Sequence, residues 1–255
     1  MTEADALVEA GRTTPALALL RPFLDRLDGD RRALAGALEP ALAYLHGMAI
    51  AGRPVADAPD APLQRLIALE PRFEQPLALM RQAFAREAGA PKGVLFSRWS
   101  DLHNHLRFGC VPVGRALLAI HGEAAIAEPA LAAFMISVGL TALLQDAPRR
   151  CRQRGQIVLP AQWFPAGAAI ETCLASRARM PALSTAYANA ACRLDEALNM
   201  AESGMRAVHN EGLRRGMAAG VYLMRRLRLR MMQRTPNVRP VSVTALDRLL
   251  MRWRT

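Results

Sequence analysis

The segment from Pro129 to Leu144 constrains the fold of this chain more than any other, because it carries no charged side chain over a length that a helix can form. It falls short of the roughly 20 apolar residues that a helix needs to cross a bilayer, and Ser137, Gly139 and Thr141 interrupt it. A helix that is apolar all round and does not span a membrane is buried. We therefore predict a buried central helix with other helices packed around it.

The rest of the chain is typical of an all-α protein. Hydrophobic residues make up 52% of the sequence, mainly Ala, Leu and Met, whereas aromatic residues make up 5%. The apolar spacing predicts helices over 16–27, 31–50, 61–69, 76–87, 97–108, 113–121, 129–145, 166–176, 181–209, 211–233 and 243–253, with a basic irregular segment over 147–165. A length of 255 residues favours one domain, covering 1–255.

The charge and the cysteines bear on partners and location. A formal charge of +11 favours an anionic partner, although arginine enrichment also follows from a GC-rich genome. The four cysteines, Cys110, Cys151, Cys173 and Cys192, are widely separated, which indicates reduced thiols rather than a zinc site. The acidic start MTEADALVEAGR lacks a signal-peptide pattern, so we expect a cytoplasmic protein.

Three segments follow one another in the order and spacing of squalene/phytoene synthases. They are LMRQAFAREAG (79–89), WSDLHNHLRFGCVPVGRALLAIHGE (99–123) and LTALLQDAPRRCRQRGQIVLP (140–160). The chain resembles above all the hopanoid-pathway branch of that family, in which an AF-x-x-D helix precedes Y-C-x-x-S-A-x-P-V-G-R and Q-L-T-N-x-x-Q-D…G-R-x-Y-L-P segments. The tail over 238–253 is similar to that branch's R-P-x-L-S ending. The resemblance runs from Leu77 to the C-terminus, and the residues before it are divergent.

The resemblance implies a helical bundle of the isoprenoid synthase type around a central apolar cavity that holds isoprenoid tails. It also implies a head-to-head condensation of two prenyl diphosphates, in which Mg²⁺ ions bridge carboxylates and diphosphate oxygens. The implied partner is therefore a prenyl diphosphate or another isoprenoid lipid. The implied cofactor is Mg²⁺ if the protein is active, and none otherwise.

The family's acidic residues are only partly present. In the second aspartate-rich motif Asp146 matches the first acid, but the position one helical turn later holds Arg150, or Cys151 if one residue is inserted. Glu87 replaces the acid of AF-x-x-D. Asp146 and Glu87 are thus the candidate metal ligands, although an Asp before Ala-Pro is also an ordinary residue of a helix end or turn. For the first motif the chain offers only the acids around Gly29, Asp25, Asp28 and Asp30.

Other family positions have also changed. The resemblance places His105, Gly139 and Ala142 at the cavity, where the family has Tyr, Gln and Asn, and it places Gln156 where an arginine contacts diphosphate. His103 and His105 form an H-x-H pair, but residues two apart on a helix point to different sides and do not share an ion.

Arginines supply the candidate diphosphate contacts. They are Arg115 of the P-V-G-R motif and the cluster Arg149, Arg150, Arg152 and Arg154. Guanidinium groups match phosphate oxygens in pairs, so the cluster is a candidate clamp, with a solvated basic loop as the alternative. Over 222–234 five more arginines surround an apolar stripe, a pattern that suits either an anionic bilayer or a core-packed helix with a basic outer face.

These features lead to one functional hypothesis and two rivals. We expect a catalytically degenerate relative of the squalene/phytoene synthases that acts as a lipid-binding, accessory or assembly protein, in the cytoplasm and peripherally at the inner membrane face. The first rival is an active prenyltransferase of squalene, hopanoid or carotenoid synthesis. The second is a nucleic-acid-binding protein, which the absence of aromatic residues among the basic ones disfavours.

Overall fold

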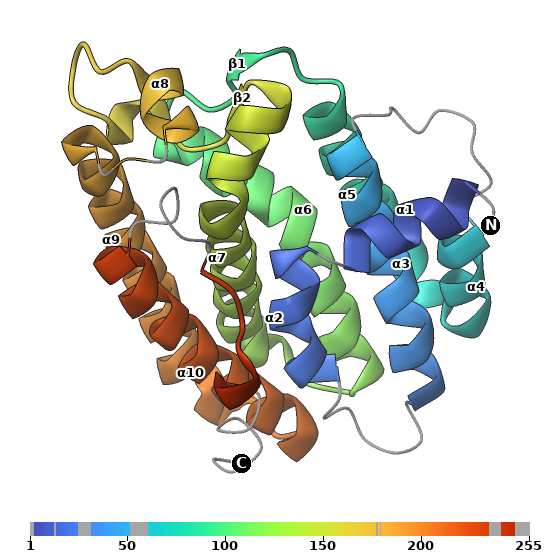
Figure 1. Cartoon of the computed structure of the whole chain (residues 1–255). Coiled ribbons are helices and arrows are strands. Elements are labelled where there is room, and N and C mark those ends of the chain that lie inside the picture. Colours follow the sequence, from blue (N-terminus) through green and yellow to red (C-terminus); the bar gives the residue numbers. More distant parts are fainter. Residues whose placement is uncertain are drawn as a thin grey trace.

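The computed structural model describes residues 3–12, 14–24, 32–51, 61–176, 178, 180–234 and 241–247. Within these residues the fold is an all-α bundle, as predicted (Figure 1). Its helices are α1 (Glu3–Arg12), α2 (Pro15–Leu24), α3 (Arg32–Ala51), α4 (Ala61–Leu69), α5 (Glu74–Ala88), α6 (Trp99–Ile120), α7 (Glu128–Arg154), α8 (Ile170–Ala175), α9 (Pro181–Gly204) and α10 (Glu211–Arg234). Two short strands, β1 (Gly93–Val94) and β2 (Gln156–Ile157), pair in parallel.

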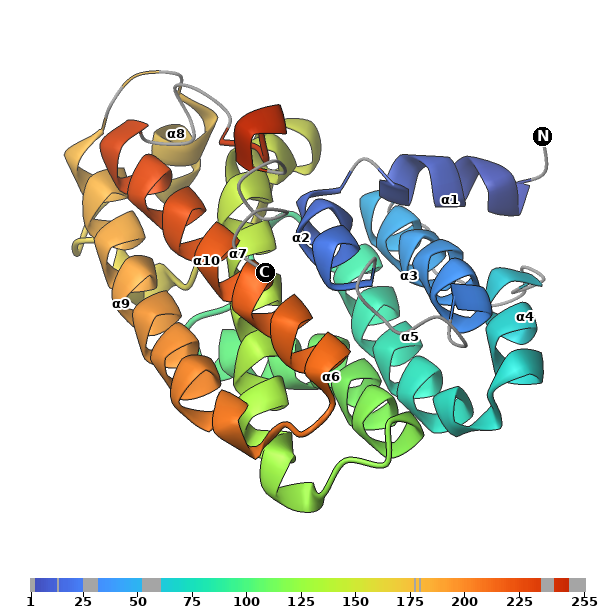
Figure 2. The same cartoon turned by 90° about the horizontal axis from the view of Figure 1, so that it is seen from below.

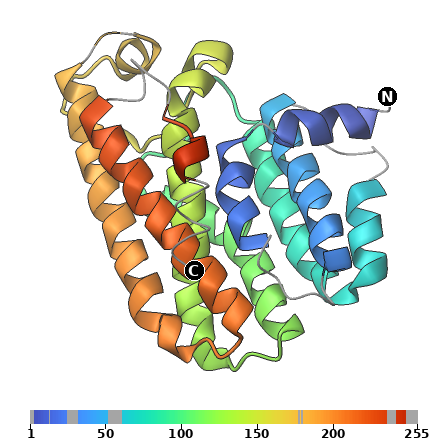
Figure 3. The same ribbon diagram turned by 60° about the horizontal axis from the view of Figure 1, so that its bottom comes forward.

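Helix α7 runs through the middle of the bundle and contacts α2, α6, α9 and α10 (Figures 1 and 2). On one side α9 and α10 pack on each other as a pair, and α10 also contacts α2 and α7 (Figure 3). On the other side α5 packs on α6, α3 packs on α5, and α1 lies across α3. The central helix therefore separates two groups of helices that reach it from different parts of the chain.

The predicted burial of the central helix is confirmed. Most of its apolar residues from Ala130 to Leu144 are buried, with no more than 9% of their surface exposed. Phe134 and Leu140 are fully enclosed. The stretch Ala125–Arg154 is the one part of the described chain that is long and apolar enough to cross a membrane, but 78% of its apolar window is buried inside the bundle. It has the burial of a core helix.

Helix α7 continues further than the sequence indicated. We predicted a basic irregular segment over 147–165. Pro148 lacks the N–H that would bond to the carbonyl of Leu144, so a helix that continues through it needs another donor for this carbonyl. The structure instead keeps the helix to Arg154, so that part of the prediction is wrong. The hydroxyl of Tyr187, on α9, donates to the Leu144 carbonyl at 2.9 Å and replaces the missing N–H. A partner 43 residues away thus makes the internal proline tolerable.

Two further predictions about the helices need correction. The predicted helices over 97–108 and 113–121 are one helix, α6, which passes through Pro112 and buries Val111, Val113 and Leu117 around it. Helix α1 was not predicted. The helix expected over 243–253 lies only partly within the described residues. The turn around Gly29, with its acids Asp25, Asp28 and Asp30, lies outside them.

Candidate functional site

The candidate site lies where α5, α6 and α7 come together. Glu87 is in the last turn of α5, His105 is in the first half of α6, and Asp146 and Arg150 are one turn apart near the end of α7. Their side chains form the polar end of a cavity of about 60 Å³. The rest of its wall is mainly apolar and comes from α2, α3, α5, α6 and α7. An apolar central cavity with acids at one end is what the resemblance implied.

Both candidate metal ligands are buried. Glu87 and Asp146 are each 5% exposed. Asp146 was expected at an exposed helix end or turn, and that interpretation is wrong, because α7 continues for two more turns beyond it. A buried carboxylate needs charged or hydrogen-bonding partners. The identity of those partners therefore decides what the site can bind.

Arg150 is the partner that the two carboxylates share. Its Nε atom lies 2.8 Å from Asp146 Oδ2, and its Nη1 atom contacts Glu87 Oε1. Burial and the positive charge of Arg154 lower the pKa of Arg150 to about 10, so the guanidinium group remains charged at neutral pH. Arg150 therefore ion-pairs inside the protein, across the gap between α7 and α5.

The second oxygen of each carboxylate is also occupied. Asp146 Oδ1 accepts a hydrogen bond from Arg149 Nε at 2.6 Å, and Glu87 Oε2 lies 3.1 Å from His105 Nε2. Burial lowers the pKa of His105 to about 4, so its ring is neutral at neutral pH. The result is a continuous chain of polar contacts from His105 through Glu87, Arg150 and Asp146 to Arg149.

The remaining arginines of the predicted clamp point elsewhere. Arg154 donates to the carbonyl oxygen of Ala49 on α3, and Arg152 is exposed on another side of α7. Arg115 pairs with Glu128 at 2.6 Å. It is ten residues beyond His105 on α6, which corresponds to about 15 Å along the helix axis. The structure thus brings Arg149 and Arg150 to the acids but not Arg115 or Arg152.

The substituted family positions serve packing. A Cβ atom on Gly139 would lie 2.7 Å from both Cys110 Sγ and Leu106 Cδ2, so the glycine lets α6 and α7 approach closely. Ala142 is 8% exposed and lines the cavity. Gln156 donates through Nε2 to the carbonyl oxygens of Glu87 and Ala90, at 3.3 and 3.1 Å, and so fastens the end of α5 to β2.

His103 and His105 diverge, as their spacing predicted. His105 faces Glu87, whereas the ring of His103 lies 5.3 Å from that of Trp99. A residue that the sequence did not reveal is His46 on α3, which lines the cavity with its ring 4.8 Å from Phe84. Burial, with the charge of Arg150, lowers the pKa of His46 to about 4. The signal for His46 in the sequence is its position one helical turn after Leu42, which also lines the cavity.

The apolar stripe of α10 is part of the core. Leu223, Met224, Leu227 and Met231 are at most 3% exposed, so the interpretation of this stripe as a bilayer-facing surface is wrong. Four of the arginines beside the stripe, Arg225, Arg226, Arg228 and Arg230, pair with acids of the protein. Arg225 contacts Glu202 at 2.6 Å and Arg228 contacts Asp195, both acids being on α9.

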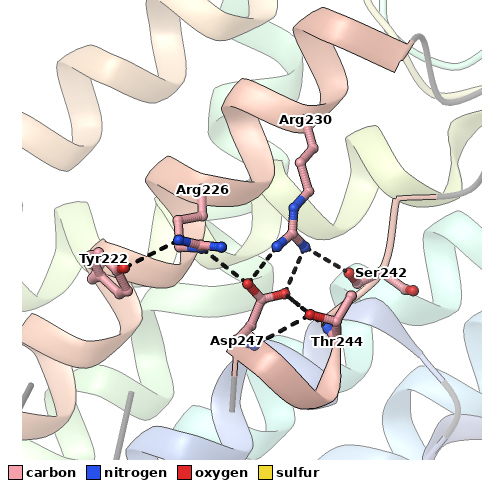
Figure 4. Close-up of polar contacts among 6 residues, drawn as sticks. All are labelled: Tyr222, Arg226, Arg230, Ser242, Thr244 and Asp247. Carbon is pink, nitrogen blue, oxygen red and sulfur yellow. Dashed lines mark hydrogen bonds and ion pairs between the residues drawn. The ribbon is translucent and has the colours of Figure 1, made fainter. Parts of the chain in front are cut away.

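Two other arginines of α10 hold the C-terminal segment. Arg230 binds both oxygens of the fully buried Asp247 at 2.6 Å, and Arg226 contacts Oδ1 at 3.0 Å (Figure 4). Thr244 and Asp247 also hydrogen-bond each other's backbone N–H, as in a capping box. Gln145 of α7 donates to the carbonyl oxygen of Val241. We call residues 241–247, fastened in this way, the C-terminal clasp.

Among the described residues, no group of three or more His, Cys, Asp or Glu side chains is placed to hold a metal ion. The two acids at the cavity, Glu87 and Asp146, make their contacts with arginine and histidine instead.

The bundle and its acid-ended apolar cavity define a protein with the isoprenoid synthase type of fold. The chain belongs to the squalene/phytoene synthase family, whose sequence profile matches residues 2–248. The fold is similar to that of squalene synthase HpnC from Alicyclobacillus acidocaldarius, with a TM-score of 0.61 and 14% identity over 86% of this chain and 93% of that one. No curated protein matches the sequence significantly. The predicted family and fold class are confirmed.

Proposed function

We propose that this protein is a catalytically degenerate member of the squalene/phytoene synthase family, which binds an isoprenoid lipid and acts as an accessory or assembly protein. The observation that carries the proposal is the ion pairing of Arg150 with both Glu87 and Asp146. The resemblance implies that acids in this family hold Mg²⁺ against a diphosphate group. Here a side chain of the protein already neutralises those acids.

The residues do not fit a magnesium site. Mg²⁺ favours octahedral oxygen coordination and gives up its water reluctantly, so it needs carboxylate oxygens that are free to bind it. All four carboxylate oxygens of Glu87 and Asp146 contact arginine or histidine nitrogens. An ion at this place would also lie beside the guanidinium group of Arg150.

The apolar wall of the cavity supports a lipid as the ligand. The cavity volume of about 60 Å³ is smaller than the roughly 300 Å³ or more of common ligand pockets. A prenyl chain therefore has to displace part of the cavity wall. Thr14, Ala16 and Leu20, in and just before α2, form one side of it. Since α2 is a helix of 10 residues, we expect it to be the part that moves.

Location and partners are further parts of the proposal. We propose that the protein is cytoplasmic and lies peripherally at the inner membrane face, where it meets an isoprenoid lipid or a protein partner. Four arginines of α10, Arg225, Arg226, Arg228 and Arg230, pair with acids of the protein, so they do not themselves support the membrane location.

An active head-to-head prenyltransferase is the second candidate. It is favoured by one observation, that Glu87 and Asp146 both face the same cavity from different helices. Catalysis would require Arg150 to leave both acids, which would leave the buried Glu87 without a counter-charge and Asp146 with Arg149 alone. A buried charge that loses its partner is strongly unfavourable, by about 3–5 kcal/mol.

The test is incubation of the purified protein with labelled farnesyl or geranylgeranyl diphosphate and Mg²⁺ or Mn²⁺. The Alicyclobacillus squalene synthase serves as the positive control and Asp146→Ala as the negative control. We expect no squalene-type or phytoene-type product. Turnover that disappears in Asp146→Ala would overturn the proposal and establish the enzyme.

Lipid binding is tested separately, by intrinsic tryptophan fluorescence during titration with farnesol. Trp163 and Trp99 stack on each other near α6 and report changes in its packing. We expect a saturable change that a bulky residue on the cavity wall, Ala142→Phe, removes. An unsaturable response, identical in the variant, would show that the cavity takes no isoprenoid chain.

A further inference from the structure

The polar end of the cavity is balanced in charge by the protein's own side chains. Glu87 and Asp146 contribute two negative charges, and Arg149 and Arg150 contribute two positive ones. The remaining neighbour of Glu87 is His105, whose Nε2 atom lies 3.1 Å from Oε2. The site therefore offers no excess negative charge to a cation from solution.

The position of Arg150 explains how one side chain reaches both acids. Residue 150 lies one helical turn after Asp146, on the same face of α7, and its side chain crosses to Glu87 at the end of α5. The planar guanidinium group presents separate N–H donors in different directions, so it pairs with two carboxylates at once. A lysine would offer one point charge in place of this fork.

The same geometry shows what a different residue would do at position 150. A carboxylate there would share a helix face with Asp146 at the spacing of four residues and would face Glu87. Three carboxylates would then converge, with Arg149 still beside Asp146. Carboxylate oxygens of this number are a typical ligand set for a hard divalent cation. Only the identity of residue 150 separates the closed network from such a site.

We propose that the guanidinium group of Arg150 is a built-in cation that takes the place of divalent metal between Glu87 and Asp146, so that a single substitution, Arg150→Asp, creates a divalent cation site. In the wild-type protein the guanidinium group of Arg150 links α5 and α7 whatever the metal concentration. The inference concerns the same acids as the proposed function, but it rests on their geometry and is tested by metal binding rather than by turnover.

The experiment is a titration of Mn²⁺ alone, followed by the loss of the free-ion signal in electron paramagnetic resonance. The variants are Arg150→Asp and Arg150→Gln, the second of which removes the guanidinium charge without adding an acid. The matched control is Arg152→Asp, which makes the same charge change on an exposed side of α7. Arg150→Asp with Asp146→Asn tests whether bound Mn²⁺ uses the native acid.

We expect wild-type protein and Arg152→Asp to bind Mn²⁺ weakly and alike. Arg150→Asp should bind it at least about tenfold more tightly, because carboxylate number sets affinity for hard cations, and Asp146→Asn should remove most of the gain. If Arg150→Asp does not fold, Arg150→Gln should still show a smaller gain, since it removes the arginine from Glu87 and leaves Asp146 with Arg149 alone.

Two results would overturn the inference. One is wild-type binding as tight as that of Arg150→Asp and dependent on Asp146, which would mean that the acids hold metal despite Arg150. The other is a folded Arg150→Asp, or Arg150→Gln in its place, with no gain over Arg152→Asp. Turnover of a prenyl diphosphate by the wild-type protein would refute the proposed function without deciding the Mn²⁺ result, so the two can fail separately.

Discussion

The hydrogen bond from Tyr187 to the Leu144 carbonyl gives the sharpest test of how the central helix is held together. Pro148 removes the N–H that would normally bond to this carbonyl, and the Tyr187 hydroxyl replaces it at 2.9 Å. Burial raises the pKa of Tyr187 far above its ordinary value, so the hydroxyl keeps its proton and remains a donor. The substitution Tyr187→Phe deletes this donor and leaves the ring, which is 3% exposed, in place.

The expected cost follows from the burial of the acceptor. Leu144 is 1% exposed, and a buried carbonyl without a donor costs about 1–3 kcal/mol. We take about 1.5 kcal/mol, which corresponds to a fall in melting temperature of about 4 °C for a chain of this size. Urea and thermal unfolding followed by far-ultraviolet circular dichroism measure both quantities.

A double-mutant cycle with Pro148→Ala isolates the hydrogen bond. Alanine restores the backbone N–H at position 148, which can then donate to the Leu144 carbonyl within the helix. In that background Tyr187→Phe should cost no more than about 0.5 kcal/mol, so the coupling between the two sites should be about 1 kcal/mol. An equal cost of Tyr187→Phe in both backgrounds would refute the reasoning.

Two other predictions concern the clasp and the close contact at Gly139. Burial alone would raise the pKa of Asp247, but the contacts to Arg230 and Thr244 outweigh it and lower this pKa from 3.8 to about 2. These contacts therefore contribute about 2 kcal/mol to the free energy of unfolding. The contribution is fully present above about pH 4 and is lost as the pH falls towards 2. Urea unfolding of wild type and Asp247→Asn at about pH 6 and about pH 3 should therefore differ most at the higher pH. Gly139→Ala should destabilise the protein by about 1–3 kcal/mol, because its Cβ would overlap Cys110 and Leu106. The matched control Gly36→Ala, in a helix with nothing within 4 Å, should stabilise it by about 0.5–1 kcal/mol, and equal effects of the two changes in thermal unfolding would contradict the packing argument.

Local pattern was sufficient to predict the all-α class and the buried central helix. The central helix was predicted from an uncharged run flanked by helix formers, which is a pattern of residues close in sequence. Helix α4 begins and ends at the predicted residues for the same reason. The end of α7 was missed because its cause is not local. Pro148 indicates a break, and the hydroxyl that compensates for it lies on α9.

The candidate site was predictable as a set of residues but not as an arrangement. The motifs identified Glu87, Asp146 and Arg150, and the structure brings all three to one cavity. The sequence could not show that Arg150 turns inward to the acids rather than outward to a diphosphate, because its partner Glu87 lies on another helix. The stripe of α10 was ambiguous for the same reason, since burial depends on which helix packs against it.

The clasp has a consequence for the order in which the chain assembles. Arg230 and Asp247 are 17 residues apart, whereas Gln145 and Val241 are separated by 96. The entropy lost on closing a loop grows with its length, so the C-terminal segment meets α10 more readily than it meets α7. Helix α10 and the clasp thus form a local unit that is complete only when residue 247 has been synthesised. In a chain synthesised from its N-terminus, Gln145 of α7 can therefore bond to Val241 only after α10 and the clasp have been made.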